Sequence, residues 1–564
     1  MKSFYSLMLI LFFVVSDSSA QLNRHIIQFK DKNGTSFSIN NPSAYLSSRA
    51  IARRTRYNIP IDSTDLPITK RYLDSIRLVS NVTILNSSKW MNQVAIQTTD
   101  LNALNKIISF SFVKSITGIA AREKSLDTTI NPKFKLETIG PELPKKNVIN
   151  AREQIDYGQA SAQINMHEGA FLHDNGFKGE GMIIAMLDAG FLSYKTNPAF
   201  DSVRMNGQVL GERDIVANAI NTDIAHGHGM NAWSTIAANR PGLMVGSAPK
   251  AKFWLFRTED VASEYPIEEQ NWLVAAEFAD SVGADMISSS LGYLYFDNPS
   301  FDYSYAQRNG KFSLVTRAAN LSAKKGMIVM NSAGNDGTNT TDRKYVLCPA
   351  DGDSVVAVGA VNVSGQIAGF SSWGPNSAGK IKPNIVSLGQ GTIIANFAGN
   401  PSAGNGTSFS NPNIAGLIVC LWQAFPEFRN MDIIDVVQRS ASKFNNPDER
   451  FGYGIPNFKT AHAILLKKRN LALYQKILAE QFIKAYPVPF KDDFSVLFKA
   501  KKDGTIVLKL FTVDGKLIET KTVSIVMDDF YKIQFKPIAS LAPAVYLVNY
   551  DDGVNNGTLK IFRN

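Results

Sequence analysis

Ser408 stands where a serine hydroxyl could act as a nucleophile. The sequence Gly-Thr-Ser-Phe-Ser-Asn-Pro at residues 406–412 runs into the apolar stretch 413–422, so we expect a helix to begin at about Ser408. The first turn of a helix presents unpaired amide donors and the positive end of the helix dipole, which is a favourable setting for a nucleophile. Most serines in such positions only cap the helix, so this segment alone does not establish catalysis. The other parts of a catalytic site must lie elsewhere in the chain.

Asp188 and His228 are the expected partners of this serine. A serine attacks a carbonyl only if a base removes its proton and a third group holds that base in the right tautomer. Asp188 follows the apolar run 182–187, which places its carboxylate at the carboxyl end of a parallel strand, where α/β proteins form their sites. His228 precedes the helical run 230–238 and could face that strand end. These residues alone leave three alternatives open: a turn aspartate, an exposed histidine, or a zinc pair of His226 and His228.

Asn335 is the candidate for the fourth part of such a site. It follows the apolar strand 327–330, within Asn-Ser-Ala-Gly-Asn-Asp-Gly at residues 331–337. Its side-chain amide could donate a hydrogen bond to the oxyanion that forms when a carbonyl is attacked. An asparagine beside a glycine is more often only part of a turn, so Asn335 is a catalytic candidate only in combination with the other three residues.

The elements that must position these residues lie between about residues 156 and 466. Short apolar runs alternate there with helical stretches, and the expected strands are residues 182–187, 253–256, 286–288, 327–330 and 355–358. Buried strands separated by helices predict an α/β fold with a doubly wound parallel sheet. The helix after Ser408 should end near Pro426, because proline resists continuation of a helix.

Together these segments resemble the subtilisin-like serine proteases, the peptidase S8 family. The order Asp188, His228, Ser408 along the chain is the order of that family, and it differs from the order in α/β-hydrolases and in chymotrypsin-like enzymes. The segments that resemble the family's Asp, His, oxyanion and Ser motifs are residues 182–190, 228–238, 331–337 and 406–416, and further family-like segments are 246–249, 370–375 and 382–385. The resemblance covers about residues 156–466.

The resemblance implies a mechanism. His228 would accept the Ser408 proton while Asp188 orients the ring, and an acyl-enzyme would form and be hydrolysed by water. Asn335 and the Ser408 amide would bind the oxyanion, and Thr407 would support the backbone there. No cofactor is required for this chemistry. Structural calcium is common in the family, although no acidic loop of this chain can be assigned to it.

The resemblance also implies where a protein or peptide substrate would bind. The implied substrate-binding residues are Ser290, Leu291, Gly292, Ala333 and Gly334. Leu347 would lie near the floor of the pocket for the residue before the cut, which favours apolar or modest-sized side chains.

Two motifs depart from the family pattern. The usual His-Gly-Thr-His-Val-Ala-Gly reads His-Gly-Met-Asn-Ala-Trp-Ser at residues 228–234, and the helix that follows aligns so as to select His228 over His226. The usual Met-Ala after the nucleophile is replaced by Phe409 and Ser410, which changes the packing behind Ser408 and leaves the reacting groups intact.

The segment before the expected catalytic domain has three parts. Residues 1–20 have a lysine, an apolar run and a final Ser-Ser-Ala, which is typical of an export signal cleaved after Ala20. Residues 21–120 alternate strand-like runs (25–29, 94–98) with helical runs (40–56, 101–108) and predict a small α+β unit. Residues 121–155 show little periodicity and predict a linker that a protease could cut.

The α+β unit resembles the pro-region of secreted subtilisin-like proteases of Bacteroidetes-type bacteria, through residues 46–50 and 58–61. Such a pro-domain would assist folding and act as an intramolecular inhibitor that blocks the cleft until it is cut away. The mature enzyme would then begin within residues 121–155.

The carboxyl-terminal part is expected to be a separate domain. A helical stretch at 470–484, with residues 467–483 as a linker helix, leads into Tyr-Pro-Val-Pro at 486–489. Residues 484–564 have short strands with Asp-Gly turns at 503, 514 and 552, which predict a β-sandwich. They resemble the sorting domain of the type IX secretion system, although Val488 and Ala544 replace the asparagine and glycine favoured there. An accessory module that binds cell-surface material is the alternative.

Composition excludes some classes of function. The net charge is +10, but most of the surplus lies in residues 21–120, which lack interleaved aromatics and are expected to be removed, so nucleic-acid binding is not expected. No stretch after the signal reaches about 18 uninterrupted apolar residues, which predicts a soluble mature protein. Cys348 and Cys420 allow at most one disulfide, and Cys420 is at least as consistent with a buried free thiol.

We therefore expect a secreted or cell-surface serine endopeptidase that is made as a zymogen and exported by the type IX machinery. The alternative is a catalytically inactive subtilisin-like scaffold that acts as a surface adhesin.

Overall fold

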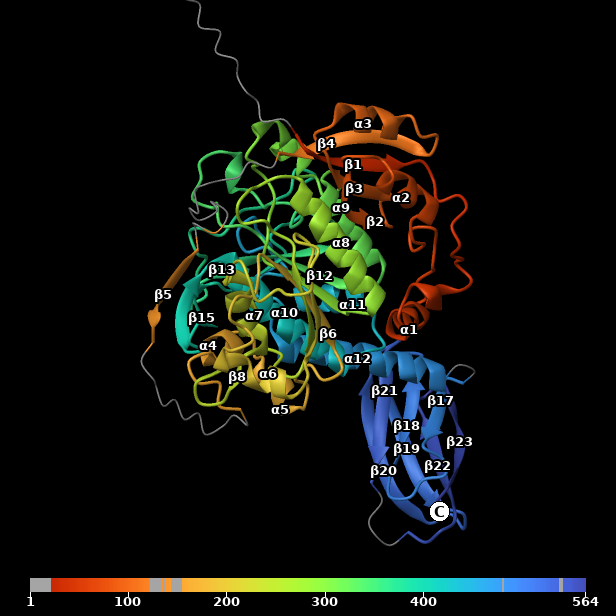
Figure 1. The fold of residues 1–564 in the computed structure, drawn as a ribbon. Helices are drawn as coiled ribbons and strands as arrows, with labels where there is room; N and C mark the ends of the chain where they lie inside the picture. The colour runs from red at the N-terminus through yellow and green to blue at the C-terminus, as the bar shows by residue number, and fades with distance from the viewer. Residues whose placement is uncertain (1–21, 122–133, 135–136, 144–154, 479–480, 537–540) are drawn as a thin grey trace, which may run out of the picture. The chain divides into compact units, whose positions relative to one another are not determined.

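The computed structural model describes residues 22–121, 134, 137–143, 155–478, 481–536 and 541–564 (Figure 1). The chain divides into two compact units, Met1–Ala461 and His462–Asn564. The expected export signal, residues 1–20, lies outside the described residues.

A parallel sheet of seven strands forms the centre of the first unit. Its order is β14-β13-β12-β11-β6-β10-β7, and every neighbouring pair is parallel. The strands are β6 (Ile183–Asp188), β7 (Val209–Asp214), β10 (Lys252–Arg257), β11 (Met286–Ser289), β12 (Ile328–Ser332), β13 (Val355–Val361) and β14 (Ile385–Leu388). All residues of β6, β11, β12, β13 and β14 are buried, as expected for strands covered on both faces. The predicted doubly wound parallel sheet is confirmed.

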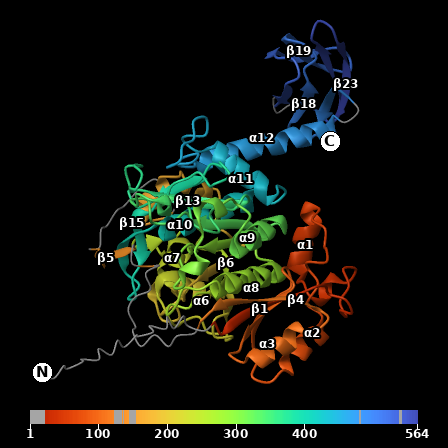
Figure 2. The ribbon, with the colours of Figure 1, turned by 90° about the horizontal axis from the view of Figure 1, so that it is seen from above.

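Two pairs of helices cover this sheet. Helix α7 (His228–Ala237) packs on α10 (Thr407–Ala424), and α8 (Ile267–Val282) packs on α9 (Leu314–Lys324); both pairs also contact strands of the sheet. Figure 2 shows the two pairs on different sides of β6. Helix α10 is buried along almost its whole length and ends two residues before Pro426, as predicted. The buried helix therefore holds Ser408, in its first turn, at a fixed position.

The expected pro-region, described from residue 22 to residue 121, forms a four-stranded antiparallel sheet in the order β2-β3-β1-β4, with three helices. The elements are β1 (Arg24–Phe29), α1 (Ser48–Tyr57), α2 (Lys70–Arg77), β2 (Thr83–Ser88), β3 (Gln93–Gln97), α3 (Leu101–Ile108) and β4 (Val113–Ala120). The helix expected over residues 40–56 is shorter, because Ser47 caps α1 by accepting from the Ala50 amide and only a 3-10 turn, Pro42–Ala44, precedes it.

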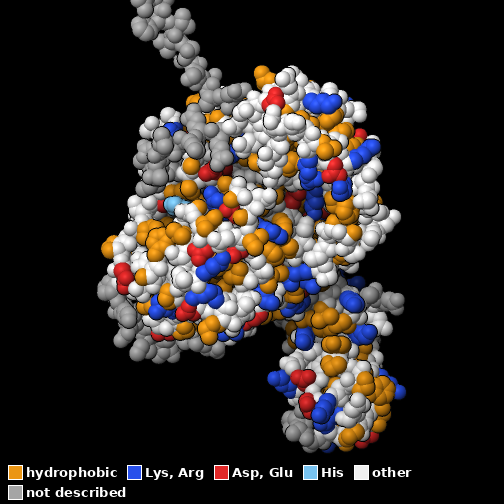
Figure 3. Space-filling model, viewed as in Figure 1, with side chains coloured by type: hydrophobic (Ala, Val, Ile, Leu, Met, Phe, Trp, Pro, Cys, Tyr) orange, Lys and Arg blue, Asp and Glu red, His pale blue; other side chains and the backbone are white. Residues whose placement is uncertain are grey.

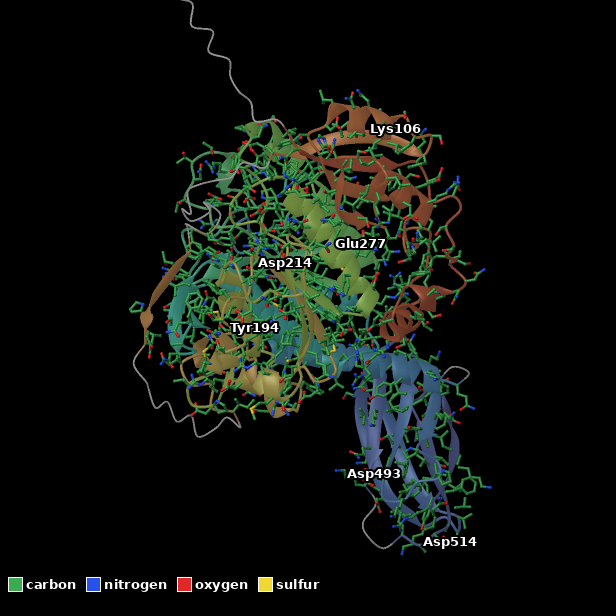
Figure 4. The ribbon with its side chains drawn as sticks, in the orientation of Figure 1. Lys106, Tyr194, Asp214, Glu277, Asp493 and Asp514 are labelled. Atoms are coloured by element: carbon green, nitrogen blue, oxygen red, sulfur yellow. The ribbon has the colours of Figure 1, made fainter. Side chains whose placement is uncertain are left out.

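This sheet docks on α8 through the turn between β2 and β3. The Glu277 carboxylate of α8 accepts hydrogen bonds from the amides of Lys89 (2.9 Å) and Trp90 (3.0 Å) and from the Ser88 hydroxyl (Figure 4). Trp90 is 5% exposed and belongs to the same buried apolar cluster as Trp272 of α8. Burial raises the pKa of Glu277 to about 7.

Helix α1 docks near the same carboxyl-terminal end of α8 through buried ion pairs. Asp280 receives Arg53 at 2.5 Å and Arg54 at 2.6 Å, one guanidinium on each carboxylate oxygen. Asp65 receives Arg54 at 3.0 Å and Lys325 at 2.8 Å. These five side chains are almost fully buried, so the pro-region and the catalytic domain share one interior ion-pair network.

The segment expected to be a linker, residues 121–155, contains a strand. Strand β5 (Thr138–Glu142) pairs antiparallel with β16 (Pro401–Asn405), which in turn pairs with β15 (Gln390–Ala395). This strand has no signal in the sequence, because the side chains of β5 are mostly exposed and show no apolar alternation. Its pairing comes from the backbone of β16.

The second unit is a β-sandwich, as predicted. Two sheets, β17-β18-β21 and β20-β19-β22-β23, share one apolar core. The strands are β17 (Ile483–Tyr486), β18 (Phe494–Lys499), β19 (Gly504–Thr512), β20 (Leu517–Ile525), β21 (Phe530–Phe535), β22 (Val545–Asp551) and β23 (Asn556–Phe562). Helix α12 (Phe458–Ile477) precedes them.

The prediction of a helix over residues 470–484 was wrong in its bounds. Helix α12 begins twelve residues earlier, at Phe458, where the Asn457 side chain accepts from the Thr460 amide at 2.9 Å. An asparagine just before a helical run is a cap signal. Residues 483 and 484 belong instead to β17.

Candidate active site

Asp188 and His228 are in direct contact. Oδ1 of Asp188, at the end of β6, lies 2.7 Å from Nδ1 of His228, the first residue of α7. The two side chains are 1% and 4% exposed. The start of α7 approaches the end of β6 as closely as the backbone permits, because a Cβ on Gly229 would lie 2.5 Å from the Gly190 oxygen and 2.8 Å from Cβ of Asp188. Glycine at 229 thus lets the helix reach the strand end.

His226 does not share this contact. Its Nδ1 accepts a hydrogen bond from the His228 amide at 3.1 Å, and its ring stacks on Phe134 with centroids 4.9 Å apart. Among the described residues, neither histidine belongs to a group with the geometry to hold a metal ion. Asp188 thus contacts His228 and not His226, which agrees with the selection of His228.

Asn335 is oriented by Thr407. Its Oδ1 accepts from the Thr407 amide at 2.8 Å and from the Thr407 hydroxyl at 2.9 Å. Both acceptor directions of the amide oxygen are therefore used, and Nδ2 is turned toward the Ser408 hydroxyl region. That nitrogen donates to Oε1 of Glu137 at 3.1 Å.

Glu137 occupies the centre of the site, and sequence reasoning missed it. Its Oε1 accepts from the Ser408 hydroxyl, and its Oε2 lies 2.8 Å from Nε2 of His228. One carboxylate thus touches the three groups expected to act on a substrate carbonyl. The resemblance to a pro-region predicted a blocked cleft, but no pattern in residues 121–155 singled out this glutamate.

The two carboxylates decide the charge of the histidine. Burial by itself would lower the pKa of His228, but Asp188 and Glu137 outweigh that effect and raise it to about 10. His228 is therefore an imidazolium at neutral pH while Glu137 is in place. For His226, burial and the neighbouring charge of His228 lower the pKa.

A cavity of about 270 Å³ opens beside Ser408. Its walls include the predicted residues Ser290, Leu291, Gly292 and Gly334, together with Leu347. Leu347 packs against both glycines: a Cβ on Gly292 would lie 2.6 Å from its Cδ1, and one on Gly334 would lie 2.9 Å from its Cγ. The remaining walls, which the sequence did not single out, are Leu294, Tyr295, Phe296, Asp336 and Arg343, among others.

Ala333 lies behind the other predicted substrate-binding residues, and its part in substrate binding stays a prediction. Its side chain is fully buried in an apolar cluster with Val346, Ala350 and Ala357, and it does not line the cavity.

Three carboxylates lie together, and one of them, Glu264, also lines the cavity beside Ser408. Among the described residues, Glu259, Glu264 and Glu268 form the group whose ligand atoms all lie within 4.8 Å of one another. Oxygen donors suit a hard cation such as calcium. Hydrogen bonds already use part of this set, because the Tyr293 hydroxyl donates to Glu259 at 2.6 Å and the Asp260 amide to Glu268 at 2.9 Å.

The two cysteines are buried free thiols, so they form no disulfide with each other. Burial raises the pKa of both, which disfavours the reactive thiolate.

Comparison with known proteins identifies the two amino-terminal parts of the chain. Residues 179–454 match the model of the subtilase family, peptidase S8, and residues 24–134 match the model of the peptidase S8 propeptide domain of Bacteroidota.

Individual relatives point the same way. Subtilisin E of Bacillus subtilis (strain 168) is 26% identical over 312 residues, which cover 55% of this chain and 71% of the relative. Subtilisin of Bacillus pumilus is 25% identical over 312 residues, 55% and 99% of the two chains. The thermophilic serine proteinase of Bacillus sp. (strain AK1) is 27% identical over 277 residues, 49% and 60% of the two chains. The chain thus carries a subtilase domain behind a propeptide domain of the Bacteroidota type, and it is a serine-type endopeptidase.

Proposed function

We propose that Asp188, His228 and Ser408 hydrolyse peptide bonds through an acyl-enzyme intermediate. The observation that most directly supports this is the 2.7 Å contact between Oδ1 of Asp188 and Nδ1 of His228, which leaves Nε2 facing the Ser408 side of the site. The carboxylate fixes the tautomer in which Nε2 accepts a proton.

In this mechanism Ser408 attacks the substrate carbonyl and gives its proton to Nε2 of His228. Nδ2 of Asn335 and the amide of Ser408 bind the oxyanion, and the helix α10 dipole favours the negative charge. His228 then returns the proton to the leaving amine, and a water molecule, activated by the same histidine, hydrolyses the acyl group. The chemistry needs no cofactor.

The decisive experiment is active-site labelling. The processed enzyme should react with a fluorophosphonate probe, and Ser408→Ala should abolish the labelling. A folded, processed protein that takes up no label would contradict the proposal and would favour the catalytically inactive scaffold. The comparisons do not support that alternative.

We further propose that the protein is exported and that its pro-region inhibits the enzyme until it is cut away. The match of residues 24–134 to a propeptide domain supports the second part. No helix among the described residues is long and apolar enough to cross a membrane. The active secreted form should begin within residues 121–155, whereas an amino terminus at 21 would contradict removal of the pro-region.

The β-sandwich is proposed as a type IX sorting domain. Its support is the sequence of residues 484–564 and the independent core of this unit. Deleting these residues should leave the protein in the periplasm. Normal export with loss of surface binding would instead favour an accessory binding module.

We propose that nucleic acid is not a partner and that substrates are proteins or peptides with an apolar residue before the cut. Basic and acidic side chains are interspersed on the face drawn in Figure 3. The apolar walls of the cavity, among them Leu291, Phe296 and Leu347, support the substrate preference.

A further inference from the structure

The segment after the pro-region crosses the catalytic centre at two described residues. The Phe134 ring lies over His228, with centroids 4.4 Å apart, and is 7% exposed. Three residues further on, the Glu137 side chain is 6% exposed and reaches Ser408, His228 and Asn335. Glu137 thus replaces solvent at the position where a substrate carbonyl would react.

We propose that Glu137 is an internal carboxylate clamp: it holds the unprocessed chain inactive by bridging Ser408 and His228 and by filling the oxyanion position beside Asn335. The inference rests on the proposed roles of these residues, and it adds the group through which the precursor silences them.

The chemistry of the site explains why a carboxylate binds there. Donors placed to stabilise an oxyanion are equally suited to a carboxylate oxygen, which carries negative charge and has similar size. Oε1 of Glu137 accepts from Nδ2 of Asn335 at 3.1 Å and from the Ser408 hydroxyl. Glu137 therefore occupies the hydrogen-bond donors that would otherwise stabilise the transition state.

The second oxygen removes the general base. Oε2 lies 2.8 Å from Nε2, the nitrogen that must accept the Ser408 proton. The groups that face His228 are Asp188 from β6, Glu137 from the crossing segment and His226 from the turn before α7. The two carboxylates keep the ring protonated, and an imidazolium cannot take the serine proton.

Strand β5 sets the position of the clamp. Thr138 pairs with Asn405 and Ile139 with Gly404, and the Asn405 amide side chain donates to the Thr138 hydroxyl at 2.8 Å. Ser408 follows Asn405 by three residues, so the same stretch of chain that pairs with β5 leads into the nucleophile. Because mostly exposed side chains contribute little burial, β5 is held chiefly by its backbone hydrogen bonds and can be removed without disturbing the core.

The test compares precursors that differ at Glu137. Refolding of the full chain is started by dilution, and two rates are followed: fluorophosphonate labelling of Ser408 in the uncut chain, and appearance of the cut form on a gel. Glu137→Gln keeps the shape and removes the charge, and Glu137→Ala removes both. Each should label about tenfold faster or more than wild type, because a lost charge-assisted contact is worth at least that factor. Glu142→Gln is the matched control, since that side chain is exposed at the far end of β5 and should leave both rates unchanged.

The outcomes separate the clamp from the proposed function. If wild-type precursor labels as fast as both Glu137 variants while the processed enzyme labels fully, the clamp is wrong and the triad stands. Slower cutting in Glu137→Gln, with unchanged labelling, would also overturn it, because Glu137 would then be a recognition residue for the cut. If the processed enzyme itself fails to label, the proposed function fails. Thermal unfolding of the same substitutions on a Ser408→Ala background shows whether they alter folding.

Discussion

Thr407 holds the Asn335 side chain in place at the catalytic centre through two hydrogen bonds. The backbone amide and the hydroxyl of Thr407 both donate to Oδ1 of Asn335, at 2.8 and 2.9 Å. The Thr407 hydroxyl in turn accepts from the Gly334 amide at 3.2 Å. The residue before the nucleophile therefore orients the amide that we propose as the oxyanion donor.

Asn335→Ala should lower kcat of the processed enzyme by about 10² to 10³, with little change in KM, because the lost contact acts mainly in the transition state. Thr407→Val should cost less, about tenfold, since it removes one of the two hydrogen bonds to Oδ1 of Asn335 and leaves the bond from the backbone amide. Steady-state kinetics on a peptide substrate measure both. Full activity in Asn335→Ala would remove this residue from the mechanism.

Leu347 and Gly292 should together set the size of the side chain accepted before the cut. A Cβ at residue 292 would lie 2.6 Å from Cδ1 of Leu347, so Gly292→Ala should narrow the cavity and lower kcat/KM for large apolar side chains. Leu347→Ala should shift preference toward larger side chains, and the double variant should recover activity. A peptide library read by mass spectrometry tests this; two independent losses that simply add would contradict it.

The folded precursor should lose stability as pH rises through 7. The pKa of Glu277 is raised by burial from 4.5 to about 7, so the folded precursor binds this proton more tightly than the unfolded chain does. This contribution to stability is fully present below pH 4.5 and is lost as pH rises through the pKa of the folded state.

Glu277→Gln tests that linkage on the Ser408→Ala precursor, which is expected not to cut itself. Between pH 5 and pH 8 the glutamine variant should gain about 3 kcal/mol of stability relative to the glutamate form, from the size of the pKa shift. Thermal unfolding at the two pH values gives the comparison. A difference that does not change with pH would rule out a role for this proton.

Asp280 should be the most sensitive position in the ion-pair network. Asp280→Asn leaves Arg53 and Arg54 buried without their shared carboxylate, at a cost of about 3 to 5 kcal/mol to the precursor. Asp74→Asn is the control, because its pairs with Lys70 and Arg77 are exposed and should matter little. Urea unfolding of Ser408→Ala precursors measures both, and equal effects would contradict a special role for the buried network.

The sequence predicted those parts of the molecule that have a period or a motif. The uniformly apolar runs anticipated strands such as β6 and β12, and the segment after Ser408 anticipated the buried helix α10. Because these elements bury their side chains, they appear in the sequence as runs of apolar residues.

Other parts depend on contacts that leave no local pattern. Strand β5 pairs by its backbone, and Glu137 reaches Ser408 only because β16 holds that strand in register. The burial of the Ala333 side chain could not be predicted either, because a motif gives the position of a residue but not the direction of its side chain. The start of α12 was missed although Asn457 offered a cap signal.

The pro-region inserts the indole of Trp90 beside α8, so the fluorescence of this tryptophan should report activation of the enzyme. Trp90 passes from an apolar cluster into water when the pro-region leaves, whereas Trp233 packs on Phe200 and Phe253 of the catalytic domain and should keep its surroundings. Its fluorescence should move to longer wavelength at that moment, so release of the inhibitor can be timed separately from cleavage of the chain, without any added label.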